Sequence, residues 1–387
     1  MSKTLFRLSF IGFVTALATR SVDPIVPAIA QGLSTDAARV ALLSTAFALP
    51  FALIQPILGP IADMAGKVKL MIACLVILVV ASFVGAMATD YSVLLASRIV
   101  AGMATGGIFP VGLAVIGDLV PVRDRQVAIG RWLTVIMTGN VLGASVAGVL
   151  NDLIGWRSVF FFIAGAGTLV FCFTIGLRSQ IPERRLPFDL RSVPRSYRAI
   201  LSNPRAKVCY IAVLFEGIAI FGLFPYVALL LLAAGEARAS IAGLVLGGFS
   251  LGALLYAMTV QMLVNRVRPE RQMQCGGVIC ALAFCVIALE LSWPVQFVAF
   301  LVAGYAFFMI HGQIQVQATE LSQTARGAAM ALHSLFFFVG QATGPVLFGI
   351  GLVAIGARWS VAIAAAIMLA LGFICAALFK RLPVSPD

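Results

Sequence analysis

Long apolar runs separated by short polar or charged breaks make up most of this 387-residue chain. A helix that crosses a bilayer needs roughly 20 mainly apolar residues. Twelve runs are of about this length, and each predicts one membrane-spanning helix. They lie at Leu5–Ile29, Arg39–Pro60, Leu70–Ala88, Val93–Gly117, Val127–Leu150, Ser158–Leu177, Val208–Leu232, Ile241–Leu263, Met273–Leu291, Val295–Val316, Gly327–Leu352 and Ser360–Phe379.

The composition supports a membrane protein. Hydrophobic residues make up 61% of the chain and charged residues only 11%, whereas a soluble domain carries about 25% charge. Helices satisfy all their backbone hydrogen bonds internally, which the bilayer core demands. The predicted fold class is therefore an all-α membrane protein with the lipid bilayer as its surroundings.

The net charge of +12 invites a nucleic-acid interpretation, so the distribution of charge matters. With both termini placed in the cytoplasm, most of the 27 lysines and arginines fall in cytoplasmic segments. Those outside are Arg39, Arg157, Arg238 and Arg358. Such a bias is the positive-inside rule. We therefore expect no nucleic-acid partner and predict a multi-pass plasma-membrane protein of the bacterial inner-membrane type, with both termini cytoplasmic.

The chain divides at its one long hydrophilic stretch. Residues 178–207 are rich in proline and arginine, which predicts a cytoplasmic linker between an N-terminal half, 1–177, and a C-terminal half, 208–387. The halves repeat weakly. Gly340-Gln-Ala-Thr-Gly344-Pro345 matches Gly139-Asn-Val-Leu-Gly143-Ala144 at an offset of 201 residues (139 to 340). Two pseudo-symmetric six-helix halves are typical of secondary transporters.

A charged turn, Gly59-Pro-Ile-Ala-Asp63-Met-Ala-Gly66-Lys67-Val-Lys69, joins the second and third spans. Its glycines allow close helix approach and a sharp reversal, and Asp63 can serve helix N-terminal amides. The turn resembles the signature loop of the major facilitator superfamily (Gly-x-x-x-Asp-x-x-Gly-Arg/Lys-x-Arg/Lys). It departs at Met64 and Lys67, where arginine is usual. The resemblance implies a gating loop made of Gly59, Asp63, Gly66 and Lys67, and the major facilitator fold.

Other motifs extend the resemblance over the whole chain. Asp23-Pro-Ile-Val-Pro27 is similar to the end of the first span in the twelve-span drug:proton antiporters, and Arg98 followed by glycines is similar to the family's fourth-span motif. The antiporter pattern in the fifth span is degraded, because Ala144 replaces a proline. The residues predicted to pack helices closely are Gly102, Gly106, Gly139, Gly143, Gly340, Gly344 and Pro345.

Charges inside spans are costly and are functional candidates by default. Asp23 and Arg98 lie at about 9 and 7.5 Å from the outer ends of their spans, at 1.5 Å per residue. We expect them to attract each other, with Asp23 as the main proton-coupling acid and Arg20 as a second partner. The alternatives are a permanent bridge between two helices and an aspartate that only caps a broken helix.

Glu216, His311 and His333 fall at one level in the second half, about 9–14 Å from the cytoplasmic ends of their spans. Glu216 is the second predicted proton-coupling residue. The histidines are predicted to contact substrate, with hydrogen-bonded packing as the alternative and a metal site built from all three as a remote one. The full set of predicted cavity residues is Arg20, Arg98, Gln55, Asn140, Tyr226, His311, His333 and Gln341.

No enzyme motif stands out, since H-E-x-x-H, G-x-S-x-G and P-loop sequences are absent. We therefore predict no enzyme, cofactor or metal. The resemblance implies a monomeric, alternating-access transporter whose partners are protons and a small-molecule substrate, most simply an exporter of a small amphipathic compound or drug. Proton-coupled uptake or exchange of a metabolite or organic anion is the alternative. A non-transporting membrane sensor or scaffold is a more remote one.

Overall fold

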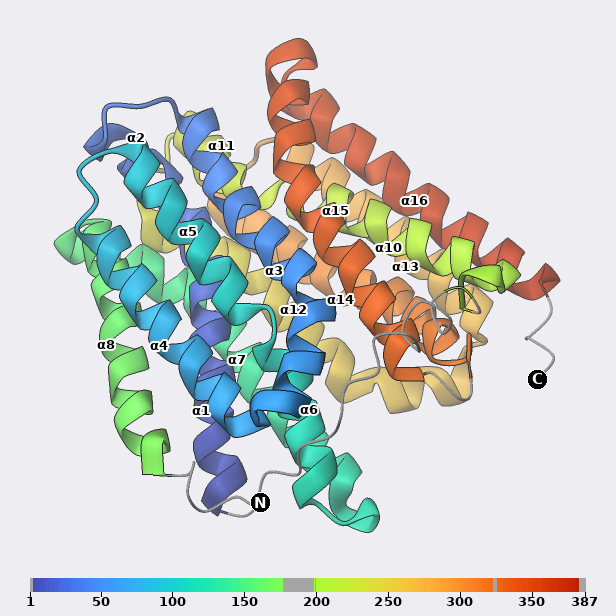
Figure 1. The fold of residues 1–387 in the computed structure, drawn as a ribbon. Coiled ribbons are helices and arrows are strands. Elements are labelled where there is room, and N and C mark those ends of the chain that lie inside the picture. The colour runs from blue at the N-terminus through green and yellow to red at the C-terminus, as the bar shows by residue number, and fades with distance from the viewer. Residues whose placement is uncertain (1–2, 177–197, 199, 323–325, 383–387) are drawn as a thin grey trace. The chain divides into compact units, whose positions relative to one another are not determined.

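A computed structural model describes residues 3–176, 198, 200–322 and 326–382 (Figure 1). Most of the predicted linker at 178–207 lies outside these residues. Within them, every regular element is a helix, and twelve helical stretches are long and apolar enough to cross a membrane. The prediction of an all-α, twelve-span membrane protein is therefore confirmed. The helix ends differ from the predicted ones by a few residues, and α10 begins at Pro204, inside the segment expected to be linker.

Residues 1–188 and 238–243 form one compact unit. Its pairs of closely packed helices are α1 with α7, α4 with α8, α3 with α5 and α4 with α5 (Figure 1). The bounds are α1 Lys3–Arg20, η1 Asp23–Ile25, α2 Val26–Gly32, α3 Ala37–Ala65, α4 Lys67–Ala86, α5 Tyr91–Thr105, α6 Ile108–Leu119, α7 Val122–Ile154 and α8 Arg157–Thr174.

Residues 189–237 and 244–387 form the second unit, in which α10 packs on α15, α13 on α16 and α13 on α14. The first turn of α12 belongs to the first unit and the rest of that helix to the second. The bounds are α10 Pro204–Phe221, η3 Phe224–Tyr226, α11 Val227–Ala233, α12 Ala239–Arg266, α13 Pro269–Ala288, α14 Trp293–Thr319, α15 Arg326–Ile355 and α16 Ala357–Arg381.

The first and seventh spans are broken in the same way. Each consists of a long helix, a single 3-10 turn that contains a proline, and a short helix. The three elements recur 201 residues later (3 to 204, 23 to 224 and 26 to 227). Pro24 and Pro225 occupy matching places, and proline lacks the N–H that an uninterrupted helix needs. The sequence repeat therefore reflects a repeat of backbone geometry.

Glycines bring matching helices into backbone contact in both units. A Cβ at Gly102 would overlap the carbonyl oxygen of Phe47, and a Cβ at Gly304 would overlap that of Phe249. Both members of the second pair lie 202 residues beyond the first (102 to 304 and 47 to 249). Gly139 faces the Phe13 carbonyl in the same manner as Gly340 faces that of Leu214. The close packing predicted from small residues is thus repeated at a nearly constant offset.

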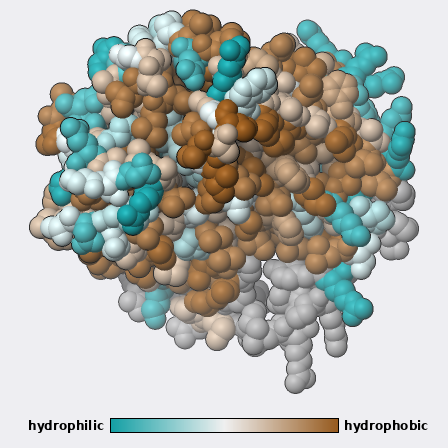
Figure 2. Space-filling model, turned by 90° about the horizontal axis from the view of Figure 1, so that it is seen from above, coloured by the Kyte–Doolittle hydropathy of each residue, from teal (hydrophilic) through white to brown (hydrophobic). Residues whose placement is uncertain are grey.

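Apolar side chains reach the surface over much of the visible face in Figure 2. Many large ones are more than half exposed, among them Leu153, Met258, Leu282 and Val353. An exposed apolar surface of this extent would be unfavourable in water and suits lipid. The helices therefore present apolar residues outward as well as inward.

We predict that Gly102→Ala and Gly304→Ala each destabilise the protein, because the added methyl group meets a backbone carbonyl that cannot rotate away. Overpacking of this kind costs about 1–3 kcal/mol. Thermal unfolding of the purified protein in detergent measures the effect. Gly165→Ala is the matched control, since a Cβ at Gly165 meets nothing within 4 Å. An equal melting temperature for all three variants would contradict the prediction.

Candidate functional site

Asp23 lies at the break in the first span, as the first residue of η1, and its side chain is 1% exposed. The Ser44 hydroxyl on α3 donates a 2.6 Å hydrogen bond to Oδ1. The Arg20 guanidinium lies 3.6 Å from Oδ2, which has no hydrogen-bond partner. A buried carboxylate oxygen that accepts no hydrogen bond, and is held only by the charge of an arginine, is costly for a structural group. This asymmetry marks Asp23 as a candidate for proton exchange.

Arg98 on α5 is buried beside this carboxylate, and the two charges attract each other without a direct ion pair. Its guanidinium donates to the Ala18 carbonyl at 3.2 Å and stacks over the Phe47 ring at 4.4 Å. The last carbonyls of a helix have no intrahelical partner, so the break after α1 offers Ala18 as an acceptor. Arg98 Nε is buried without a partner. Depth along the helices predicts that Asp23 and Arg98 lie close together, but it does not reveal which backbone carbonyl Arg98 contacts.

Glu216 on α10 is fully buried and contacts His311 on α14, with 2.8 Å between Oε2 and Nδ1. The His333 ring on α15 lies 5.2 Å from the His311 ring, centroid to centroid. Phe307 stacks on His311 at 4.9 Å. Glu216 Oε1 and His333 Nε2 have no hydrogen-bond partner. The structure thus brings together the three titratable residues that the sequence placed at one level.

The predicted gating loop turns at Gly66, whose φ of 100° suits glycine. Lys67 Nζ then pairs with Asp118 Oδ2, at the end of α6, at 2.5 Å. Asp118 was not among the predicted residues of this loop, although an acidic residue that ends a span near two lysines is a usable signal. The position of the Asp63 side chain and the surroundings of Gly59 lie outside what the structure describes.

The comparisons with known proteins agree on one family. The family described as Major Facilitator Superfamily matches residues 8–325 and 236–387. The chain belongs to the Major Facilitator Superfamily. This confirms the resemblance seen in the signature loop, and it makes the protein a multi-pass membrane transporter with a small-molecule substrate.

Relatives of this major facilitator protein include drug-resistance proteins. The quinolone resistance protein NorA of Staphylococcus aureus is 25% identical over 359 residues, which cover 90% of each chain. Multidrug resistance protein 2 of Bacillus subtilis is 21% identical over 348 residues, covering 87% of this chain and 86% of that one.

Solved structures share the fold. A bacterial homolog of the human lysosomal transporter Spinster, in an inward-facing and unoccupied conformation, has a TM-score of 0.80 at 19% identity and covers 100% of this chain and 99% of its own. A D-xylose-proton symporter also has a TM-score of 0.80, at 14% identity, with 98% and 97% covered.

The remaining predicted cavity residues of this major facilitator protein have varied surroundings. The Tyr226 hydroxyl donates to the Pro345 carbonyl at 2.9 Å, so it is occupied inside its own unit. Gln55 and Gln341 are buried, and Asn140 is half-buried. In the part of the chain that the structure describes, no three His, Cys, Asp or Glu side chains converge closely enough to hold a metal ion.

The two titratable clusters occupy different places in the repeated scaffold. The positions that match Asp23, Phe47 and Arg98 hold three phenylalanines, Phe224, Phe249 and Phe300, which pack on one another (23 to 224, 47 to 249 and 98 to 300). Conversely, the positions that match Glu216, His311 and His333 hold Thr15, Phe109 and Trp132. Each unit thus has charged or titratable groups where its counterpart has mainly aromatic ones.

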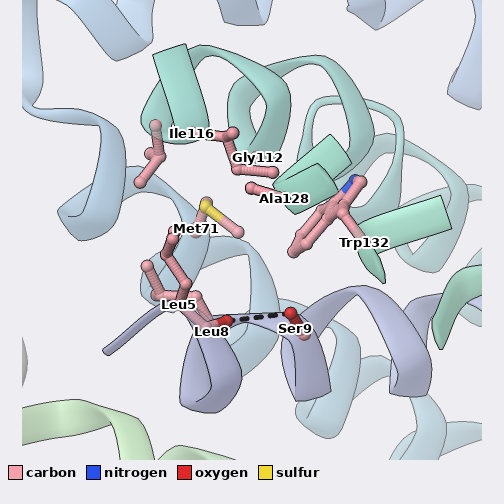
Figure 3. Close-up of a pocket in the computed structure, with 9 residues that line it drawn as sticks. Leu5, Leu8, Ser9, Met71, Gly112, Ile116, Ala128 and Trp132 are labelled. Atoms are coloured by element: carbon pink, nitrogen blue, oxygen red, sulfur yellow. Dashed lines mark hydrogen bonds between the residues drawn. The ribbon is translucent and has the colours of Figure 1, made fainter. Parts of the chain in front are cut away.

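An apolar pocket in the first unit carries no comparable chemistry (Figure 3). Its lining comes from α1, α4, α6 and α7, and the Ser9 hydroxyl in it donates to the Leu5 carbonyl of its own helix at 2.8 Å. The indole nitrogen of Trp132 is drawn on the side of the ring away from Ser9. We therefore treat this pocket as a packing feature.

We predict that Ser44→Ala lowers the stability of the protein more than Ser9→Ala does. The Ser44 hydroxyl supports a buried carboxylate, and hydrogen bonds to charged groups contribute about 1.5–3 kcal/mol. The Ser9 hydroxyl only bonds back to its own helix. Thermal unfolding of both variants in detergent checks this. Equal shifts would mean that Asp23 does not depend on Ser44.

Proposed function

We propose that this transporter exports a small amphipathic compound in exchange for protons, working as a monomer in a bacterial inner membrane with both termini cytoplasmic. The observation that carries the proposal is a pair of buried acids, Asp23 in one unit and Glu216 in the other, each with an oxygen that accepts no hydrogen bond. Resistance proteins among the relatives support export of this class of compound. No ATP-binding motif is present in the sequence, so we propose that an ion gradient drives transport. A membrane potential of 100 mV supplies about 2.3 kcal/mol for each charge moved.

Proton exchange at Glu216 follows from its contact with His311. The pair can hold one proton on either partner and remain neutral overall, which suits a site buried among phenylalanine rings. When water reaches the pair, the unbonded Oε1 of Glu216 is a place where a proton can be lost or gained. Asp23 exchanges protons in the same way at the break in the first span, where the Ser44 hydrogen bond and the Arg20 ion pair hold its side chain in place. We propose that the signature loop with Asp63 and Lys67 supports the cytoplasmic gate.

Proton-coupled uptake or exchange of an organic anion is the second candidate. The buried Nε of Arg98 has no hydrogen-bond partner, and a carboxylate or phosphate group would satisfy it. A D-xylose-proton symporter has the same fold, so the fold alone does not favour export over uptake. The same assay distinguishes the candidates, because export and uptake move protons in opposite senses relative to the substrate.

Reconstitution into proteoliposomes with an internal pH-sensitive dye tests the proposal. Amphipathic cations, neutral drugs and organic anions are added in turn, with empty vesicles as the blank. A proton flux that depends on both protein and compound identifies the substrate class and its direction. If no compound moves protons while a labelled compound is still transported, proton coupling is wrong.

We predict that Glu216→Gln abolishes proton-driven accumulation but spares counterflow, the exchange of labelled for unlabelled substrate. The amide keeps the shape of the side chain and removes the titratable proton. Glu290→Gln is the matched control, because Glu290 is exposed at the end of α13. Equal loss of both activities would instead make Glu216 a structural or substrate-binding residue.

A second acid gives a second prediction. Asp23→Asn should also prevent proton-driven accumulation, whereas Asp90→Asn, at an exposed helix cap, should not. Folding is checked by size-exclusion chromatography and thermal unfolding, because loss of one buried partner costs about 3–5 kcal/mol. Well-folded Asp23→Asn protein that still concentrates substrate with protons would show that Asp23 is not a coupling acid.

A further inference from the structure

Asp152, near the end of α7, holds the start of another helix. Its Oδ1 accepts a hydrogen bond from the Ala239 N–H at 3.0 Å, and its Oδ2 accepts one from the Ser240 N–H at 2.8 Å. These are the first two residues of α12. The first N–H groups of a helix have no partner within it and carry partial positive charge. The carboxylate therefore caps α12 from outside, with one oxygen for each N–H.

Two backbone contacts lie beside this cap. A Cβ at Gly148 would overlap the carbonyl of Ala239, and a Cβ at Gly243 would overlap that of Ala144. Ala144 and Gly148 are one turn apart on α7, as Ala239 and Gly243 are on α12. The Ser145 hydroxyl also donates to the Gly243 carbonyl at 3.3 Å. The first turn of α12 is thus seated along the last turns of α7.

Helix α12 belongs partly to each of the two compact units. Residues 238–243 cluster with the first unit, whereas residues 244–266 of the same helix cluster with the second. Helix α7 is the fifth span and α12 the eighth. In an alternating-access cycle the two units move as separate bodies. A continuous helix can follow its own unit only if its first turn leaves α7.

We propose that Asp152 is a positioning residue whose carboxylate clamps the first turn of α12 to α7, and that this clamp is released and remade in each transport cycle. The inference rests on the proposed alternating-access function. A carboxylate suits the task because it binds two successive N–H groups, yet Asp152 is exposed, so water can take over both bonds on release. An asparagine offers only one acceptor oxygen, and an alanine offers none.

Hydrogen–deuterium exchange tests the clamp without any substrate. In Asp152→Ala, the amides of residues 239 and 240 should exchange several-fold faster than in the unaltered protein, and Asp152→Asn should be intermediate. Asp90→Ala is the matched control, since Asp90 caps its own helix through the N–H groups of Ser92 and Val93. Unchanged exchange at 239 and 240 in Asp152→Ala would overturn the clamp, whatever the protein transports.

A reversible cross-link tests release. The variant Asp152→Cys with Ser240→Cys is made in a background where the three exposed cysteines, Cys172, Cys275 and Cys285, are alanine. Oxidation, or a short bifunctional thiol reagent, joins the two positions, and the substrate found in the proteoliposome assay reports transport. Joining should stop net transport, and reduction of the disulfide should restore it.

The outcomes of the two experiments separate the two proposals. Transport at full rate by the cross-linked protein would show that the contact is permanent and would overturn release. If the unaltered protein transports nothing, the proposed function fails, and the exchange measurement still decides whether Asp152 holds α12.

Discussion

Contact between a glycine and the carbonyl of a neighbouring helix is the constraint on which both units depend. Inside a bilayer, helices gain little from hydrophobic burial against each other, so close van der Waals packing has to hold them together. Gly102 against Phe47 and Gly304 against Phe249 set this spacing in the two units. The same spacing fixes which side chains can meet, because it leaves no room for intervening water. The titratable clusters are therefore consequences of backbone packing as much as of residue choice.

The two clusters stabilise buried ionisable side chains in different ways. At the break in the first span, Arg98 is held by the Ala18 carbonyl, which also accepts a hydrogen bond from the Ser21 hydroxyl, and by the face of Phe47. In the second unit, Glu216 is held by a histidine that can itself carry a proton. The first cluster therefore always contains a charged group, the Arg98 guanidinium, whereas the Glu216–His311 pair can be neutral. Different protonation chemistry follows from these surroundings in two units that have the same backbone plan.

The span count, the repeat and the grouping of Glu216, His311 and His333 could be predicted, because hydrophobic run lengths and depth along a helix are properties of sequence. The partner of Arg98 could not be predicted in this way. It is a backbone carbonyl at the break after Arg20. Every residue has such a carbonyl, so the sequence does not show which one Arg98 contacts. Ser44 was missed because a serine in a span is ordinary. The cap by Asp152 was missed because nothing in the sequence relates the end of one span to the start of another three spans later.

The exchange of side chains between matching positions bears on how such proteins diversify. Where the first unit has Asp23 and Arg98, the second has Phe224 and Phe300 on an equivalent backbone. A duplicated gene that encodes such a scaffold can thus lose ion chemistry in one copy and keep it in the other by a few codon changes. No refolding is needed, because the glycine contacts and the broken helices remain. One ancestral architecture can in this way give rise to descendants whose coupling residues lie in different spans.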